Sequence, residues 1–200
     1  LIASGAAQGA TWYVDADAPG PANGLTWQTA FKNPQGALVA AGPNDTIRVA
    51  KGTYMPDGGF RPVGGSHTAG TGDRTATFQL KNGVALYGGY AGHGAPDPDL
   101  RNIVLYESIL NGDLSANDVY VDCVNSSPDC DGLGGLCADG SCIIPDDNDE
   151  NSYHVVTGSG TDGSAVLDGF TITAGNANGA DSNNAGGGMY NDSSSPTVTN

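Results

Sequence analysis

Short apolar strings separated by polar, glycine-containing segments run along most of this chain. Each string is three to eight residues long and is bounded by Gly, Asn or Asp, which is typical of β-strands. In the string that ends at Thr173, Phe170 and Ile172 alternate with threonines, as expected for a strand with one buried face. The predicted strands are Thr46 to Ala50, Ala76 to Leu80, Val84 to Tyr87, Ile103 to Tyr106, Tyr153 to Thr157, Val166 to Thr173 and Thr197 to Thr199.

The first forty residues show a different pattern. A β-prone run at Thr11 to Asp15 is broken by Pro19, Gly20 and Pro21. The segment from Trp27 to Ala41 then has apolar residues among good helix formers, and Gly42-Pro43 ends it. We therefore expect a strand, a loop and one or two short amphipathic helical turns.

Local pattern alone leaves the direction of strand pairing open. Asn82-Gly83 and Asp168-Gly169 are two-residue turns that would suit antiparallel hairpins. Similar strings also recur after 29, 18, 17 and 26 residues, counted from Val49 to Phe78, Leu86 to Val104, Val155 to Ile172 and Ile172 to Val198. These intervals lie near the length of one coil in a solenoid protein, which favours parallel stacking.

Composition indicates one acidic, folded domain. The chain has 200 residues, including 32 glycines without a three-residue period, and 38% hydrophobic residues, which excludes collagen and a disordered chain. Its net charge of −15 repels phosphate backbones, so we expect no nucleic-acid partner. No segment has the roughly 20 apolar residues of a membrane span.

The ends and one long insertion divide the chain further. Residues 1–9 are predicted to be the remnant of a signal peptide, with Ala7-Gln8-Gly9 as the cleavage site. The alternative is a flexible N-terminal arm. Residues 10–200 form the predicted domain, with repeated units from 42 to 200. Within it, Gly112 to Ser152 is too polar to have its own core and is predicted to be an outward loop.

The insertion contains all four cysteines: Cys123, Cys130, Cys137 and Cys142. Four thiols allow three pairings, and in an exported chain we expect two disulfides between sequence neighbours. A zinc site is the rival interpretation, although the spacing lacks Cys-x₂-Cys pairs. This cysteine usage predicts a secreted, extracellular or cell-surface protein.

The insertion also has an acidic run that could bind a cation. Carboxylates are the ligands that Ca²⁺ prefers, and a solvated acidic loop is the alternative. The predicted ligands of a weak calcium site are Asp146, Asp147, Asp149 and Glu150. We expect no required cofactor, and Ca²⁺ is the one ion that this run is predicted to bind.

Several motifs occur in an order that resembles a known family. Tyr13-Val14-Asp15 with Gly24 and Trp27 is followed by Asp45 to Tyr54, and later by Leu80 to Val84 and Leu86 to Tyr90. Further motifs are Asn111-Gly112-Asp113, Asn151 to Val156, Leu167 to Ile172 and Gly187 to Asn191. Together they resemble bacterial secreted right-handed parallel β-helix proteins of the pectin-lyase-like superfamily.

The resemblance implies an all-β fold: a right-handed parallel β-helix with an N-terminal capping strand, a short amphipathic helix and a long disulfide-bearing loop. Trp27, Phe31 and Leu38 would then cover the N-terminal end of the coils. No matching cover occurs near Val198, so we expect the coils to continue beyond residue 200 or to stack head-to-tail on another copy. The expected partners are this chain itself or further domains of the same chain.

Enzymes that cleave polysaccharides share this fold, so catalysis has to be argued from a site. A lyase needs a basic residue beside carboxylates, but the basic residues are scattered: Arg48, Lys51, Arg61, Arg74, Lys81 and Arg101. His67, His93 and His154 lack a Ser or Cys partner at a recognisable spacing and are interpreted as surface or turn residues. Tyr87 and Tyr90 could stack on sugars, although the glycines between them favour local packing.

The sequence therefore predicts no catalytic residue and an uncertain enzyme status that leans toward none. The predicted function is a non-catalytic extracellular structural or adhesive module of a bacterial surface protein or filament, with polysaccharide as a further partner. The alternative is a carbohydrate-active enzyme with its catalytic residues outside this segment.

Overall fold

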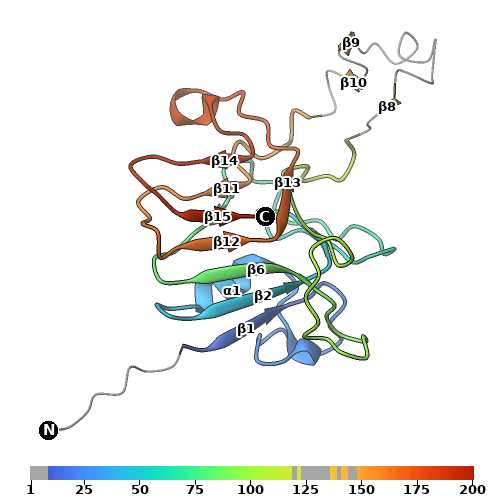
Figure 1. Ribbon diagram of the computed structural model, residues 1–200. Coiled ribbons are helices and arrows are strands. Elements are labelled where there is room, and N and C mark those ends of the chain that lie inside the picture. The colour runs from blue at the N-terminus through green and yellow to red at the C-terminus, as the bar shows by residue number, and fades with distance from the viewer. Residues whose placement is uncertain (1–8, 119–120, 123–135, 139–140, 144–147) are drawn as a thin grey trace, which may run out of the picture.

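A computed structural model of residues 1–200 describes residues 9–118, 121–122, 136–138, 141–143 and 148–200. Its largest sheet has five strands in the order β1-β2-β6-β12-β15, and all neighbours are parallel. The strands are β1 (Thr11–Val14), β2 (Thr46–Ala50), β6 (Ala85–Tyr90), β12 (Val166–Asp168) and β15 (Thr197–Thr199), stacked in Figure 1.

Two smaller sheets lie beside the five-stranded sheet. One has the order β13-β7-β3-β4, in which β4 is antiparallel to β3 and the other pairs are parallel. Its strands are β3 (Gly52–Tyr54), β4 (Phe60–Arg61), β7 (Ser108–Asn111) and β13 (Phe170–Thr173). The other is the parallel sheet of β14 (Met189–Tyr190), β11 (Val156–Thr157) and β5 (Phe78–Gln79).

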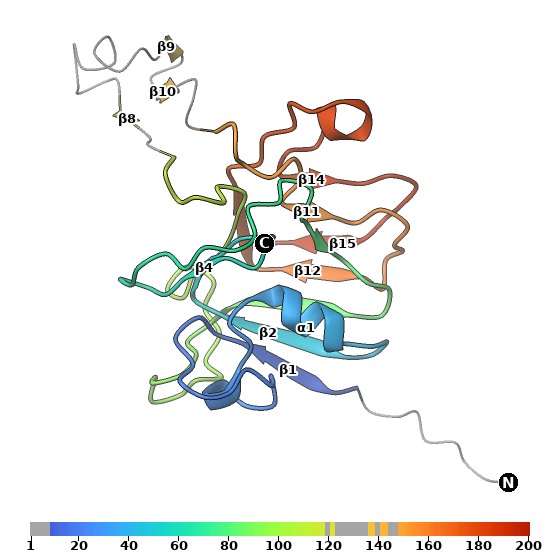
Figure 2. The ribbon, with the colours of Figure 1, turned by 180° about the vertical axis from the view of Figure 1, so that it is seen from behind.

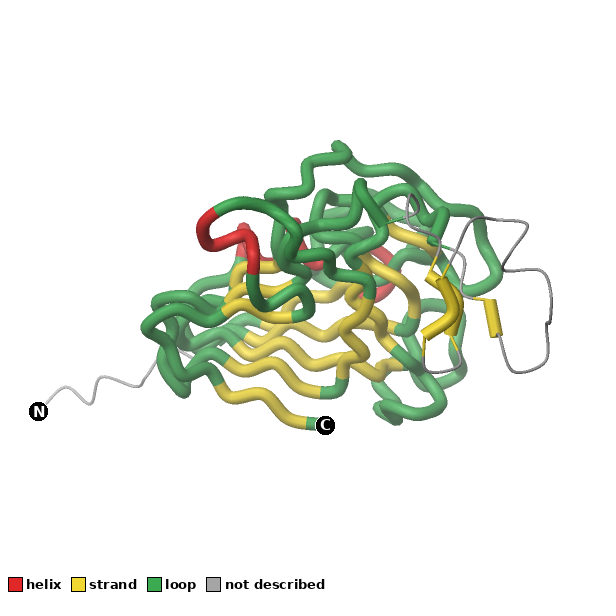
Figure 3. The backbone as a smooth tube through the Cα atoms, turned by 90° about the horizontal axis from the view of Figure 1, so that it is seen from above, coloured by secondary structure: helices red, strands yellow, loops and turns green. Residues whose placement is uncertain are grey.

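The insertion contributes a fourth sheet, in which the described pairs are antiparallel. Its strands are β8 (Val121–Asp122), β10 (Ser141–Ile143) and β9 (Leu136–Ala138), in that spatial order. Short helices complete the elements: η1 (Trp27–Thr29), α1 (Pro34–Ala40) and η2 (Asp181–Asn184). Figure 3 shows strands as neighbouring yellow runs, with loops and helices around them.

The local sequence explains where α1 begins. The side chain of Asn33 accepts a hydrogen bond from Gln35 N at 2.9 Å, and Pro34 occupies the first helical position, where no amide hydrogen is needed. At the other end, Lys81 Nζ donates to Leu38 O at 2.9 Å. The helix buries Ala37 and Leu38 against the sheets and lies over β2 in Figure 2.

The core is built from rows of apolar residues in matching register. Ile47, Leu86, Leu167 and Val198 are consecutive partners across β2, β6, β12 and β15. The first three are almost completely buried, and Phe78, Leu110 and Val156 from the smaller sheets join the same cluster. Burial of an aliphatic or aromatic side chain contributes about 1.5–3 kcal/mol, so these rows provide the main driving force for the fold.

The predicted right-handed parallel β-helix is wrong as the fold class. The structure combines parallel and antiparallel pairs in several small sheets and includes helical segments. The antiparallel pairs are made by β4, β8, β9 and β10, which lie outside the strings that the sequence predicts as strands. The disulfide-bearing loop is not seen either: Cys123 and Cys130 lie outside the described residues, and Cys137 and Cys142 are described only by their backbone.

The predicted strand from Ile103 to Tyr106 is also wrong. This segment is a turn in which Asn102 Oδ1 accepts hydrogen bonds from Val104 N and Leu105 N at 3.1 and 3.0 Å. The side chain of Asn102 therefore satisfies backbone groups that a strand would pair, as Asn commonly does in turns. Val104 is 88% exposed, and the strand begins later, at Ser108.

The two sequences that suited hairpins do not form them. Asn82-Gly83 links β5 to β6, and Gly169 separates β12 from β13, but each pair belongs to two different sheets. Gly83 and Gly169 have φ values of +75° and +77°. Glycine adopts these angles without steric cost, so at these positions it turns the chain from one sheet to the next.

Candidate cation site

Three carboxylates meet where the insertion leaves and rejoins the sheets. Oxygen atoms of Asp113, Asp118 and Glu150 all lie within 4.8 Å of one another. Asp113 follows β7 by two residues, and Glu150 precedes β11. Chain segments more than thirty residues apart are therefore joined at one acidic cluster.

The first segment of the cluster is a loop folded around Asp113. Asn111 Oδ1 accepts a hydrogen bond from Asp113 N at 3.1 Å. The two oxygens of Asp113 accept bonds from Asn117 N at 3.1 Å and Asp118 N at 3.2 Å. Because Asp113 is only 5% exposed, these bonds fix its carboxylate in one position.

The second segment is attached to the first by direct hydrogen bonds. Asn151 Nδ2 donates to Asp118 Oδ2 at 2.8 Å, and Ser152 N donates to Gly112 O at 2.8 Å. Arg74 Nε holds the same segment from the other side through Asn151 O at 2.6 Å. Glu150 is thereby kept beside the loop of Asp113.

This second segment has three buried oxygens without hydrogen-bond partners. They are Glu150 Oε1, Asn151 Oδ1 and Ser152 Oγ, and the statement applies to the described part of the chain. Asn151 is 2% exposed and Ser152 is fully buried. Buried polar atoms normally have a partner, so three consecutive exceptions require an explanation.

A cavity of about 180 Å³ opens beside the two aspartates. Its lining residues are Arg61, Asn111, Asp113, Ala116, Asp118, Thr173 and Ala174. Arg61 is exposed and forms no ion pair among the described residues. The space beside the carboxylates is therefore polar and open to solvent species.

The structure places the predicted calcium ligands only in part. Glu150 belongs to the cluster, whereas Asp149 is an exposed neighbour outside it. Asp146 and Asp147 lie outside the described residues. Sequence reasoning missed Asp113 and Asp118 because they are distant in sequence from the acidic run, and the only signal was the motif Asn111-Gly112-Asp113.

The basic residues considered for lyase chemistry are engaged in other contacts. Arg74 Nε and Arg101 Nε donate to the backbone carbonyls of Asn151 and Gly88, and Lys81 binds the end of α1. Arg48 pairs with Asp99 at 2.7 Å, and Lys51 Nζ lies 5.8 Å from the centre of the Tyr106 ring. Arg61 alone has no such contact within the described ranges.

Asp168 shows how one carboxylate is used structurally. It forms an ion pair with Arg101 and accepts a hydrogen bond from Thr199 Oγ1 at 2.5 Å. Burial raises the pKa of this carboxyl, but the bonds from Thr199, Arg101 and Asn200 together outweigh burial and lower it. These contacts favour the ionised form of Asp168 and join β12 to Arg101 and to β15.

The aromatic residues considered for sugar stacking pack against their neighbours. Tyr90 is 8% exposed, with its ring centre 5.7 Å from that of Trp27. The guanidinium of Arg101 lies 5.3 Å from the centre of the Tyr87 ring. These contacts agree with local packing of both tyrosines.

The histidines are not assembled into a catalytic group. His154 Nδ1 lies 3.2 Å from Gly186 O, and its ring stacks on Tyr190 with centres 4.7 Å apart. The backbone N of His93 donates to Asp15 Oδ2 at 2.6 Å, which is a structural contact. His67 Nε2 is buried without a hydrogen-bond partner in the described part of the molecule.

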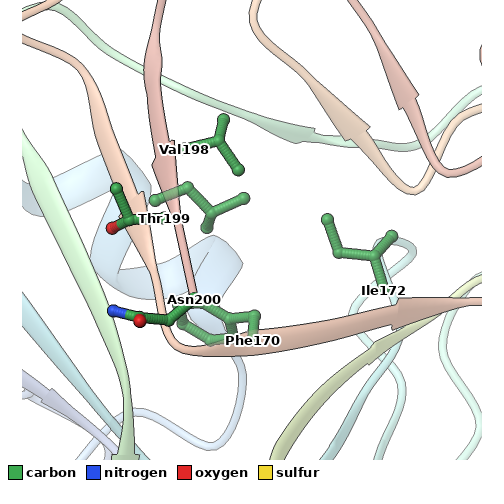
Figure 4. A pocket seen from close by; sticks show the side chains of 6 residues that line it. Phe170, Ile172, Val198, Thr199 and Asn200 are labelled. Carbon is green, nitrogen blue, oxygen red and sulfur yellow. The ribbon is translucent and has the colours of Figure 1, made fainter.

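A second cavity of about 220 Å³ lies at the C-terminal edge of the sheets. It is lined by Leu167, Phe170, Ile172, Val198, Thr199 and Asn200. Figure 4 shows Val198 and Ile172 extending into the same space from β15 and β13. This cavity is mainly apolar and has no arrangement of acid and base.

No protein-family model, curated protein or solved structure matches this chain at a significant level. The resemblance to the pectin-lyase-like superfamily therefore stays a prediction. Among the described helices, none has the length and apolar character needed to cross a membrane.

Proposed function

We propose that this chain is a non-catalytic structural or adhesive module that acts outside the cell. The observation that carries the proposal is the use of its charged side chains. Lys32, Arg74, Lys81 and Arg101 donate to backbone carbonyls, and Arg48 pairs with Asp99. A base for proton abstraction has to be free to reach a substrate, whereas these groups hold the fold together.

Several aspartates support the same interpretation. Asp45 accepts hydrogen bonds from Gly42 N and Trp12 Nε1 at 2.9 and 3.0 Å, and Asp162 Oδ1 accepts one from Ser164 N at 2.9 Å. Asp15 accepts bonds from Asp17 N and His93 N. Such contacts are typical of carboxylates that stabilise turns.

The C-terminal edge is the surface through which we propose that residues 1–200 associate with a further strand, supplied by continuation of the same chain or, when residues 1–200 are isolated, by a second copy. β15 pairs only with β12 in the described structure, and Val198 is 51% exposed above the apolar cavity of Figure 4. An unpaired strand edge with an apolar floor favours pairing with another strand.

The opposite edge of the five-stranded sheet is less suitable for such pairing. Tyr13 N donates to Gly24 O, and Tyr13 O accepts from Phe31 N, both at 2.9 Å, so the outer side of β1 is already occupied there. We therefore expect two C-terminal edges to meet each other. This symmetric contact closes as a pair and does not extend into a fibre.

The proposed lack of catalysis is tested by incubating the protein with acidic and neutral polysaccharides. We expect no new reducing ends and no unsaturated uronate products. Arg61→Ala is the informative variant because Arg61 lines the cavity beside the acidic cluster. Turnover by the wild type that Arg61→Ala abolishes would contradict a non-catalytic role and favour a carbohydrate-active enzyme.

A further inference from the structure

We propose that Asp113, Asp118 and Glu150 bind one Ca²⁺ ion, with Asn151 as an additional oxygen ligand. The three carboxylates come from the two ends of the insertion and lie within 4.8 Å of one another. Ca²⁺ binds oxygen at 2.3–2.6 Å, so ligands on opposite sides of one ion lie about 4.6–5.2 Å apart. The observed spacing therefore fits a single Ca²⁺.

A second observation comes from the neutral side chain in the cluster. Asn151 is only 2% exposed, its Nδ2 contacts Asp118 at 2.8 Å, and its Oδ1 has no hydrogen-bond partner among the described residues. In the ion-bound protein, rotation of the amide by half a turn would exchange the two atoms, and a shared bond to the ion would replace the hydrogen bond between Asn151 and Asp118. A cation would then provide the partner that this oxygen lacks.

Glu150 Oε1 supports the same ligand. It is buried and has no donor in the described structure, although a charged oxygen is costly to bury unsatisfied. A divalent cation would compensate that cost and would also reduce the mutual repulsion of the three carboxylates. Mg²⁺ fits less well because its shorter bonds of about 2.0–2.1 Å require a tighter ring of ligands.

The position of the site defines what the ion would do. Asp113 and Asp118 lie where the insertion leaves β7, and Glu150 and Asn151 lie where it returns toward β11. The ion would fasten both ends of the insertion at the sheets. This role goes beyond the proposed structural function, and it can fail without affecting the evidence against catalysis.

Thermal unfolding with CaCl₂, MgCl₂ or a calcium chelator tests the site. At a free Ca²⁺ concentration ten times the dissociation constant, the folded-to-unfolded ratio rises about elevenfold. For a chain of this size, that corresponds to a rise in Tm of about 3–6 °C. We expect a clear rise with millimolar CaCl₂ and a smaller one with MgCl₂, and an unchanged Tm with CaCl₂ would overturn the proposal.

Glu150→Gln is the principal variant because Glu150 Oε1 has no donor to lose. In chelator, the variant should be at least as stable as the wild type, since one of three like charges is removed. In CaCl₂, it should lose most of the wild-type gain in Tm. The variant should therefore have the higher Tm in chelator and the wild type the higher Tm in CaCl₂. Such a reversal identifies an ion-binding carboxylate, because substitution of a merely structural residue would lower Tm in both conditions.

Asp149→Asn is the matched control. It makes the same change in charge one residue away, at an exposed side chain outside the cluster. It should retain the full response to CaCl₂, and Asp118→Asn should lose that response as Glu150→Gln does. Loss of the response in Asp149→Asn, or its retention in both cluster variants, would place the ion elsewhere and overturn the site.

Discussion

Leu167 and Val198 are register partners in the parallel pair of β12 and β15, yet Leu167 is 2% exposed and Val198 is 51% exposed. The same row of inward residues therefore passes from a closed core to an open edge within one strand spacing. Leu167 therefore stabilises the fold, whereas the side chain of Val198 is accessible to a further strand.

The first prediction concerns this pair. Leu167→Ala should lower the free energy of unfolding by about 2–5 kcal/mol, because it leaves a cavity between Leu86 and Val198. Val198→Ala should cost less than about 1 kcal/mol, because its side chain is half exposed. Urea unfolding of both variants measures the difference, and equal losses would contradict the difference in burial between Leu167 and Val198.

The second prediction concerns the contact between Lys81 and α1. Lys81 Nζ donates to Leu38 O near the C-terminus of the helix, where backbone carbonyls lack partners. Lys81→Met keeps most of the side chain and should reduce stability by about 1 kcal/mol. Lys51→Met is the control, since Lys51 faces the ring of Tyr106 and not a helix end. An equal or larger loss in the control would argue against the helix contact.

The third prediction concerns pH. The hydrogen bond from Gly42 N, followed by that from Trp12 Nε1, lowers the pKa of Asp45 below its usual value of 3.8. Ionised Asp45 therefore stabilises the fold above that value, and this contribution disappears as pH falls through the lower, folded-state pKa. Wild-type stability should thus fall more steeply below about pH 4 than that of Asp45→Asn.

Chemical denaturation over acidic pH measures this slope. Asp181→Asn serves as the control because Asp181 is an exposed aspartate of η2. It should retain the wild-type slope. An Asp45→Asn curve parallel to that of the wild type would show that the bonds to Asp45 do not couple to stability.

The fourth prediction concerns the cysteines. Cys137 and Cys142 are directly opposite in the antiparallel pair of β9 and β10. Opposite residues in such a pair have Cα atoms about 4.5–5.5 Å apart, which is within the range of a disulfide. We therefore expect peptide mapping of secreted, unreduced protein to link Cys137 to Cys142. Four free thiols would contradict it.

Several short strands could be predicted from the sequence because their apolar residues are local in the chain. Thr46 to Ala50 and Thr197 to Thr199 have the predicted bounds. Ile103 to Tyr106 failed because strand propensity was assessed without the side chain of Asn102, which binds the backbone of that segment. The fold class failed because β4, β8, β9 and β10 are strands of two or three residues with antiparallel partners, and such short strands have no apolar string that marks them in the sequence.

The candidate site was predictable only at Glu150. An acidic run marked the region, but the ligands that complete the cluster lie more than thirty residues earlier, in a loop organised by Asn111 and Asp113. Their proximity depends on hydrogen bonds between Asn151 and Asp118 and between Ser152 and Gly112. Such long-range pairs leave no local pattern in one sequence.

The proposed structural role is tested most directly by the association state of the protein. For a protein of residues 1–200, sedimentation equilibrium should show a pair for the wild type and a monomer for Val198→Lys, because a charge on the exposed edge opposes strand pairing. Val104→Lys introduces the same charge at a residue that is 88% exposed in a turn, and it should behave as the wild type does. A wild-type protein that remains monomeric at all concentrations, or a Val198→Lys variant that still pairs, would contradict association through β15.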